Sequence, residues 1–173
     1  MPGAPSLAAS AGIGQITLTW TTPGDGGSPI LGYNVYRDGA LLANYLAVSG
    51  SPYVDSTVTP GTAYSYYVTA ANAVGEGAAS NTDTATPPTV PGAPSLVATD
   101  GIGQVDLSWS VPANGGSPIT GYDIYRDGAL LVSGLGSTSY TDTVAAGTYA
   151  YYVVAVNAVG GGPASNTVAG TSS

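Results

Sequence analysis

The sequence predicts an all-β protein made of two consecutive β-sandwiches, each with about seven short strands. Apolar and polar residues alternate in several short segments, as they do in half-buried strands, and no stretch of ten or more residues has the 3.6-residue period of a helix. The chain of 173 residues contains 26 Gly and 13 Pro, which supply many turns. Most of the first half also recurs in the second half.

The recurrence is regular enough to define the domains. Matching segments lie 89 positions apart early in each repeat and 85 positions apart late in it, as Trp20 with Trp109, residues 32–39 with 121–128, and residues 72–75 with 157–160. A period of this length fits a whole small domain and is too long for a solenoid unit. We therefore predict two domains, residues 1–87 and 88–173.

The linker between the domains lies around residues 86–91 and contains Pro87, Pro88 and Pro91. Three prolines in six residues favour an extended polyproline II conformation, so we expect the domains to sit end to end. The chain begins and ends in phase with the repeat. We therefore expect a piece of a longer array, or a two-domain unit that assembles end to end.

The first strand of each repeat is expected at a sheet edge, because proline has no N–H to donate to a neighbouring strand; these prolines are Pro2, Pro5, Pro91 and Pro94. The second strand, residues 16–20 and 105–109, alternates with period two and ends in Trp.

The third strand should point Tyr33 and Val35 inward and Asn34 outward. It ends at Asp-Gly in both repeats, a strong signal for a hairpin turn. A later strand, residues 64–70 and 149–155, places alternate Tyr, Tyr, Val and Ala residues on one face.

The first repeat contains, in this order, the proline-led strand, Trp20, the Ile30-x-x-Tyr33-x-Val35 pattern, the Pro60-to-Tyr64 segment and the Val68-x-Ala70-x-Asn72-x-x-Gly75 pattern. This order resembles a fibronectin type III domain, and it occurs twice over. The resemblance covers nearly all of the chain and implies two immunoglobulin-like sandwiches. It also implies a structural core that contains Trp20, Tyr33, Tyr64, Trp109, Tyr122 and Tyr149. Tyr64 and Tyr149 match the tyrosine corner, whose hydroxyl bonds to the backbone a few residues upstream. The second copy lacks the proline there and is one residue shorter.

The composition excludes several kinds of chemistry. The chain has no Cys, His or Lys, and two Arg against ten Asp and Glu give a net charge of −8. A His/Cys metal cluster, a Ser–His or Cys–His pair, a Schiff-base lysine and a disulfide are therefore impossible. We expect no catalytic residues, no metal and no cofactor. Two distant arginines make no nucleic-acid footprint, and no apolar run is long enough for membrane insertion.

Recurring carboxylates could bind calcium or transfer protons. Asp38 and Asp127 recur, as do Asp55 and Asp142, but each sits beside Gly, Ser or Thr, so we expect them to serve in turns or for solubility. Asp25 becomes Asn in the second repeat, which argues against a shared ligand set.

Outward tyrosines are the candidate contact surface. Tyr36 and Tyr67 have outward parity on strands that are neighbours in the family fold, and Tyr125 and Tyr152 repeat the pair. Such a pair could stack on sugar rings or on another subunit. It could equally be a cross-strand pair that only stabilises the sheet.

These features predict a non-catalytic structural or interaction module: a spacer or adhesion element of a prokaryotic extracellular or cell-surface protein, with a protein or a polysaccharide as its partner. Two alternatives stay open. One is a self-assembling subunit of an extracellular fibre or virion appendage. The other is an accessory module of a polysaccharide-degrading enzyme.

Overall fold

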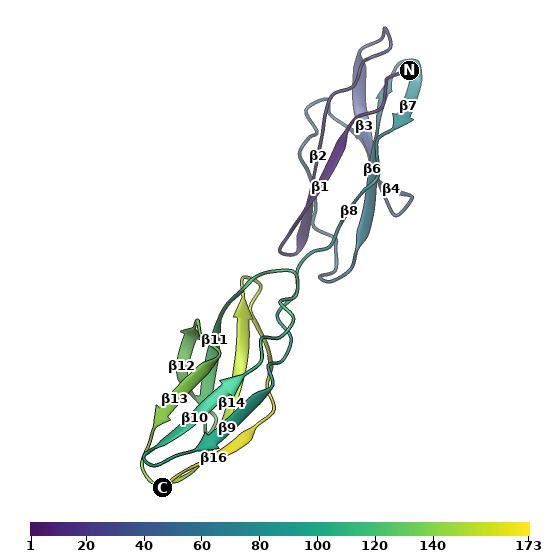
Figure 1. The fold of residues 1–173 in the computed structure, drawn as a ribbon. Coiled ribbons are helices and arrows are strands. Elements are labelled where there is room, and N and C mark those ends of the chain that lie inside the picture. The colour runs from purple at the N-terminus through teal and green to yellow at the C-terminus, as the bar shows by residue number, and fades with distance from the viewer. The chain divides into compact units, whose positions relative to one another are not determined.

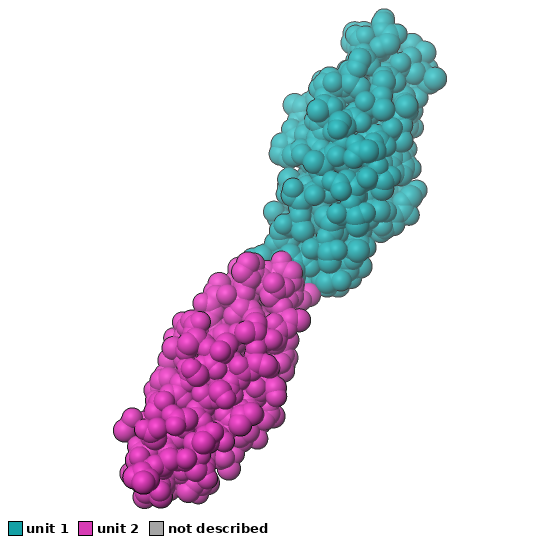
Figure 2. Space-filling model, in the orientation of Figure 1, with its two compact units in different colours: residues 1–88 teal, residues 89–173 magenta. Residues whose placement is uncertain are grey.

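The computed structural model describes all 173 residues except the side chain of Tyr45. The chain divides into two compact units, Met1–Pro88 and Thr89–Ser173 (Figure 2). The described backbone contains strands and turns and no helix, so the all-β prediction is confirmed.

Unit 1 is built from eight strands (Figure 1): β1 (Leu7–Gly12), β2 (Gln15–Trp20), β3 (Ile30–Arg37), β4 (Ala40–Leu46), β5 (Tyr53–Asp55), β6 (Tyr64–Asn72), β7 (Gly75–Ala79) and β8 (Asp83–Ala85). They form two antiparallel sheets. The smaller sheet has the order β1-β2-β5, and the larger has the order β4-β3-β6-β7, with β8 also paired to β6.

Unit 2 repeats this arrangement with β9 (Leu96–Asp100), β10 (Gln104–Trp109), β11 (Ile119–Arg126), β12 (Ala129–Leu135), β13 (Ser139–Thr143), β14 (Gly147–Asn157), β15 (Gly161–Ala164) and β16 (Val168–Ser172). The smaller sheet is β13-β10-β9. The larger is β12-β11-β14-β15, with β16 paired to β14.

Each unit has eight strands where the sequence predicts about seven, because the last two strands pair with the same neighbour, β6 or β14, and are separated by a short interruption. In unit 1, β7 and β8 pair with successive parts of β6, and residues 80–82 between them leave the ladder. Ser80 bonds to both backbone groups of Val68, through its hydroxyl at 3.0 Å and its N–H at 2.9 Å. Asn81 is thereby free to turn toward β1.

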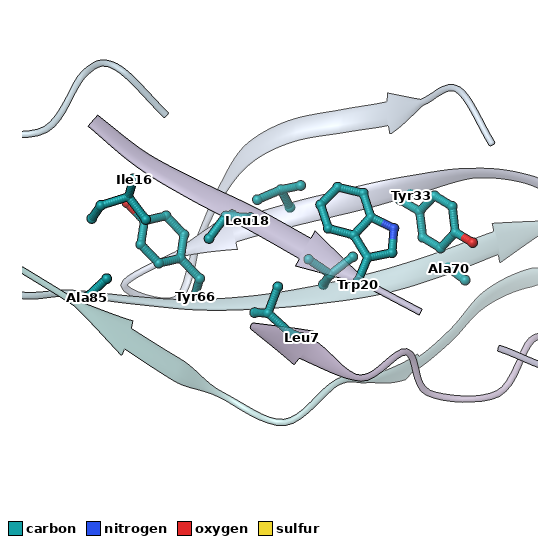
Figure 3. Close-up of a cluster of buried hydrophobic side chains, with 10 residues drawn as sticks. Leu7, Ile16, Leu18, Trp20, Tyr33, Tyr66, Ala70 and Ala85 are labelled. Carbon is teal, nitrogen blue, oxygen red and sulfur yellow. The ribbon is translucent and has the colours of Figure 1, made fainter. Parts of the chain in front are cut away.

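The core of unit 1 lies between its two sheets and follows the period-two pattern of the strands (Figure 3). Trp20 from β2 meets Tyr33 from β3, with ring centroids 5.4 Å apart. Aliphatic and aromatic side chains fill the remainder, among them Leu7, Ile16, Leu18, Val35, Tyr66, Val68 and Ala70. Burial of these apolar side chains is the main favourable contribution to folding. Neither unit has a disulfide to add to it.

The turns and edges follow the sequence signals. Asp38 and Gly39 form the β3–β4 turn with φ of 50° and 81°, a left-handed geometry that favours Asn, Asp and Gly. Strand β1 lies at an edge of the smaller sheet, and Pro2 and Pro5 precede it.

Candidate functional site

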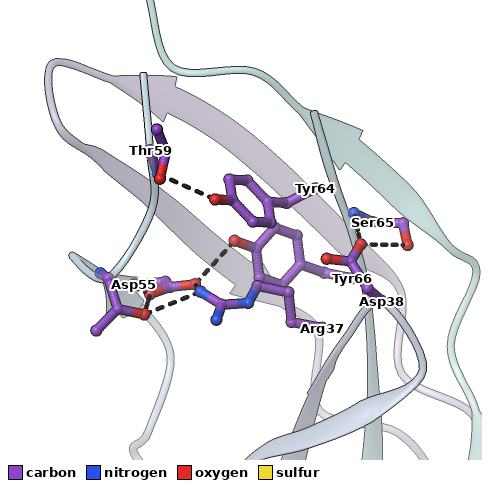
Figure 4. Close-up of polar contacts among 8 residues, drawn as sticks. Arg37, Asp38, Asp55, Thr59, Tyr64, Ser65 and Tyr66 are labelled. Carbon is purple, nitrogen blue, oxygen red and sulfur yellow. Dashed lines mark hydrogen bonds and ion pairs between the residues drawn. The ribbon is translucent and has the colours of Figure 1, made fainter. Parts of the chain in front are cut away.

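One hydrogen-bonded network joins the two sheets of unit 1 (Figure 4). Arg37 at the end of β3 donates from Nη1 to Asp55 Oδ2 at 2.7 Å, and the Tyr66 hydroxyl donates to the same oxygen at 2.9 Å. Thr57 donates to Asp55 Oδ1 from its N–H at 2.9 Å and from its hydroxyl at 2.7 Å. The Asp55 side chain is only 1% exposed, so its charge depends on these four donated bonds.

Unit 2 contains a similar network without the two bonds that Thr57 donates in unit 1, because the Val144 N–H donates to the Gly103 carbonyl at 3.1 Å. Arg126 Nη1 lies 2.8 Å and 3.1 Å from the two carboxylate oxygens of Asp142, and the Tyr151 hydroxyl donates to Oδ2 at 2.8 Å. Val144 stands where unit 1 has Thr57, so the threonine hydroxyl is missing. Both arginines of the chain are therefore paired with a buried carboxylate of their own unit.

The pKa shifts in this network move the pKa values of its titratable groups further from pH 7. Burial alone would raise the pKa of Asp55, but the hydrogen bonds from Thr57, Tyr66 and Arg37 outweigh burial and hold it below its ordinary value. Burial and the neighbouring carboxylate raise the pKa of the Tyr66 hydroxyl. General acid–base catalysis works best with a pKa near the operating pH, so the network has the character of a structural ion pair.

The prediction that Asp55 and Asp142 are turn residues is wrong. Asp55 ends strand β5 and Asp142 lies in β13, and these residues are 2% and 3% exposed. Their Ser and Thr neighbours suggested turns. The signal that pointed to an ion pair was the joint recurrence of two aspartates and of the chain's two arginines.

The remaining recurrent carboxylates do lie in turns. Asp38 and Asp127 each adopt a φ of 50° and accept a backbone N–H from β6 or β14 at 2.9 Å. Asp25 accepts the N–H of Gly27 at 2.9 Å, and Asn114 accepts that of Gly116 at the same distance. Because an amide replaces the carboxylate without loss of this bond, the position is structural.

The outward tyrosines form two stacked pairs. Tyr36 lies opposite Tyr67 and Tyr125 lies opposite Tyr152, with ring centroids 4.5 Å apart in both pairs. The interplanar angles are 10° and 9°, so the rings close each other's facing sides, and all four side chains remain partly exposed. This is the geometry of a cross-strand aromatic pair, and it leaves ring edges and outer faces for any ligand.

An exposed leucine extends each pair across a third strand. Leu41 lies opposite Tyr36 and is 53% exposed, and Leu130 lies opposite Tyr125 and is 55% exposed. In unit 1 the side chains of Leu41, Tyr36 and Tyr67 form a row across three strands, and this row also borders Glu76. Glu76 Oε1 accepts a hydrogen bond from the Tyr36 hydroxyl at 2.9 Å and another from the Thr69 hydroxyl. Hydrogen bonds from Asn34, Thr69 and Tyr36 lower the pKa of Glu76.

Four of the six aromatic residues that the resemblance assigns to the core lie deep in it: Trp20, Tyr33, Trp109 and Tyr122. Tyr64 and Tyr149 lie at its edge and are only partly buried, each beneath an arginine guanidinium at 5.1 and 5.4 Å. The Tyr64 hydroxyl accepts the N–H of Thr59 at 3.0 Å, whereas the Tyr149 hydroxyl donates to the carbonyl of Ala145 at 3.2 Å. Both hydroxyls thus bond to the backbone a few residues upstream.

No group of three metal-ligating side chains occurs among the described residues. Two surface depressions of unit 1 have volumes of about 270 and 290 Å³. Of their lining residues, only Arg37 and Asp38 carry a charge, and both are engaged in the bonds described above. The part of the chain that the structure describes has no helix of the length and hydrophobicity needed to cross a membrane.

The fold and its polar networks thus define a tandem of antiparallel β-sandwich modules. The family model of the fibronectin type III domain matches residues 4–86. The first unit therefore belongs to the fibronectin type III family, and the second unit repeats its sequence and strand order, so the chain is a tandem of two such domains.

Several known proteins resemble the chain. Exoglucanase B of Cellulomonas fimi is 34% identical over 92% of this chain and 16% of its own length. Chitinase A1 of Niallia circulans is 34% identical over 96% of this chain and 25% of its own length. Usherin of Mus musculus is 30% identical over 84% of this chain and 3% of its own length. A crystal structure of chicken CNTN1 FN1–FN3 domains has a TM-score of 0.45 and 20% identity, over 99% of this chain and 67% of that chain.

Proposed function

We propose that the chain is a non-catalytic accessory module of an extracellular bacterial enzyme that degrades a polysaccharide. The observation that supports this most strongly is its likeness, over nearly all of its length, to an exoglucanase and a chitinase. The chain spans only 16% and 25% of those relatives, so it corresponds to a part of each. This likeness supports neither adhesion nor filament formation, so the proposal extends to neither.

The residue types agree with a supporting role. A glycosidase typically uses two carboxyl groups, one of which has a raised pKa and acts as an acid. Asp55 and Glu76 both have lowered pKa values and are held by internal hydrogen bonds. We therefore assign the chain no step in bond cleavage.

The surface charge favours a neutral polymer over an anionic one. Arg37 and Arg126 are both engaged in internal ion pairs, so the described side chains present no unpaired guanidinium to a phosphate or sulfate group. A neutral glucan or a chitin chain meets no such electrostatic penalty. Enzymes that act on such polymers work where the polymer lies, so the proposed location is extracellular or at the cell surface.

The test is to fuse the chain to a catalytic domain that cleaves cellulose or chitin. We expect the fusion to act faster than the isolated catalytic domain on the insoluble polymer and at the same rate on a soluble oligosaccharide. A flexible Gly/Ser linker of equal length serves as the control for simple spacing. Equal rates for all three proteins on the insoluble polymer would refute the proposal.

The stacked tyrosines are tested separately. If the outer faces and edges of Tyr36 and Tyr67 contact the polymer, Tyr36→Ala and Tyr67→Ala will reduce retention in a polysaccharide pull-down. Because the facing sides of the rings are closed, we expect only a modest contribution. Unchanged retention would assign the pair to sheet stability alone and would leave the accessory role standing.

A further inference from the structure

The chain contains a single Asn-Gly dipeptide, Asn114-Gly115, in the turn between β10 and β11. In such a dipeptide the backbone nitrogen of the glycine can attack the side-chain amide carbon of the asparagine, because glycine has no side chain to obstruct the ring that forms. Every other asparagine precedes Val, Tyr, Ala or Thr, whose side chains hinder the attack: Asn34, Asn44, Asn72, Asn81, Asn157 and Asn166. Asn114 is therefore the residue at which this reaction is sterically open.

The turn leaves the reacting groups free of competing bonds. Asn114 is exposed, and neither its Nδ2 nor the Gly115 N–H has a hydrogen-bond partner among the groups that the structure describes. The Gly116 N–H donates to Asn114 Oδ1 at 2.9 Å. A donor at this oxygen stabilises the negative charge that develops there when the amide carbon is attacked. The nucleophile and the leaving nitrogen are thus unengaged, and the oxygen between them is already polarised.

The backbone of the turn is held in place from outside. Gly115 and Gly116 have φ of 68° and 84°, so two successive left-handed residues make the turn tight. The Asn114 carbonyl accepts the Ser117 N–H at 3.3 Å and Asn157 Nδ2 at 2.9 Å. Because the turn is fixed in this way, the neighbouring groups need not be gathered from a flexible loop before they react.

Unit 1 has an aspartate at the corresponding position of the same turn. Asp25 Oδ1 accepts the Gly27 N–H at 2.9 Å, and Asn72 Nδ2 donates to the Asp25 carbonyl at 2.8 Å. Gly26 and Gly27 have φ of 65° and 85°, nearly the values found in unit 2. The turn therefore accommodates the carboxylate that hydrolysis of the Asn114 amide would produce.

We propose that Asn114 deamidates spontaneously in the folded protein, so that unit 2 acquires the carboxylate that unit 1 already carries. Solvent base removes the proton of the Gly115 nitrogen, and this nitrogen forms a bond to Asn114 Cγ. The bond from Cγ to Nδ2 breaks, and Nδ2 takes up a proton from water and leaves as ammonia. Water then opens the succinimide ring at either carbonyl carbon, which gives aspartate or isoaspartate. This modification goes beyond the accessory function proposed above.

The two products affect unit 2 differently. Aspartate preserves the backbone of the turn. Isoaspartate routes the chain through Cβ and Cγ, which lengthens the backbone by one carbon and displaces the carbonyl that Asn157 contacts. Asn157 Nδ2 also donates to the Thr89 carbonyl at 2.8 Å, so the segment that enters unit 2 loses support together with the turn.

The test incubates the intact chain at pH 8 and follows each asparagine by peptide mass spectrometry after chymotrypsin digestion. We expect the peptide with residue 114 to gain the mass difference between –NH2 and –OH about tenfold faster than any other asparagine peptide. The rate should also rise about tenfold per pH unit, as does the deprotonated fraction of a weakly acidic N–H. Conversion of Asn114 no faster than that of the other asparagines would overturn the proposal.

A second arm asks whether the folded turn supports the reaction. The same incubation in urea measures the rate for the unfolded chain. We expect the folded chain to react at least as fast, because its turn keeps the reacting groups together and unengaged. A rate about tenfold or more below that of the unfolded chain would mean that the turn blocks the attack, and would contradict the proposal.

The repeat provides a matched exchange of the two positions. In the double variant Asp25→Asn with Asn114→Asp, the Asn-Gly dipeptide moves to unit 1 and is removed from unit 2. Since the two turns share their geometry, we expect the deamidation to move to residue 25 with a rate within about threefold of the original. Failure of residue 25 to react in this variant would show that the shared turn does not promote the reaction.

Discussion

Two tyrosines of unit 1 are fully buried, but their hydroxyl groups are in opposite situations. The Tyr66 hydroxyl donates to the carboxylate of Asp55, whereas the Tyr33 hydroxyl has no partner among the described groups. A buried hydrogen bond to a charged group stabilises a fold, and a buried polar group without a partner destabilises it. The same substitution at the two positions should therefore have different effects.

We expect Tyr66→Phe to lower the free energy of unfolding by about 1.5–3 kcal/mol, because it removes a bond to a buried charge. Tyr33→Phe should leave the free energy of unfolding unchanged or raise it slightly. Urea unfolding at pH 7, followed by tryptophan fluorescence, measures both changes. An equal loss for the two variants would show that ring packing, and not the hydroxyl, determines the cost.

The Asp55 network also predicts how stability depends on pH. The pKa of Asp55 is lower in the folded state than in the unfolded chain, so its contribution is complete above the unfolded pKa of about 4 and is lost as the pH falls through the folded pKa. Thr57→Val makes unit 1 resemble unit 2 and removes one donor. We expect it to lower the free energy of unfolding by about 1 kcal/mol at pH 7 and by less at pH 2. A loss that is independent of pH would contradict this assignment.

At this scale the sequence predicted the turn aspartates but not the buried ones. The turn role of Asp38 depends on its neighbour Gly39, which is visible in the local sequence. The ion pair of Asp55 depends on Arg37, 18 residues away on a different sheet. The Ser and Thr residues near Asp55 look like turn residues until the fold shows that Thr57 is a hydrogen-bond donor.

At the scale of strands, alternation predicted the sheets well. Parity alone identified the inward residues of 16–20, because β2 has one buried face. In β6 parity identified Tyr66, Val68 and Ala70, but Thr69 and Ala71 on the opposite face are buried as well. Interruption of the last strand was not predictable in this way. It depends on how Ser80 bonds to Val68 and on the contact of Asn81 with β1, which are interactions between strands far apart in sequence.

The stacked tyrosines on neighbouring strands should couple energetically. A double-mutant cycle with Tyr36→Ala and Tyr67→Ala should give a coupling energy of about 0.5–1.5 kcal/mol, the usual range for an aromatic pair. Tyr125 and Tyr152 should give a similar value, since their stack has the same geometry. Urea unfolding of the single and double variants provides the measurement. Additive losses would mean that the rings do not stabilise each other.

At the scale of the whole chain, each repeat contains the same complete set of parts. Each unit has its own aromatic core, its own arginine–aspartate pair and its own asparagine, Asn81 or Asn166, that bonds to the backbone of the first strand. The repeat was evident from the sequence because its matching segments keep a nearly constant spacing. The contact of Asn81 and Asn166 with the first strand was not evident, because neither residue gives a local signal of its partner at the start of its unit.

The most direct test of this account is whether each repeat is a self-sufficient module. Each unit contains one tryptophan, Trp20 or Trp109, so Trp20→Phe and Trp109→Phe leave a fluorescent probe in one unit of the intact chain. Urea unfolding of these variants can be compared with that of the fragments 1–88 and 89–173. We predict one cooperative transition per unit, with the same midpoint in the fragment as in the intact chain. A fragment that shows no cooperative transition would contradict the account.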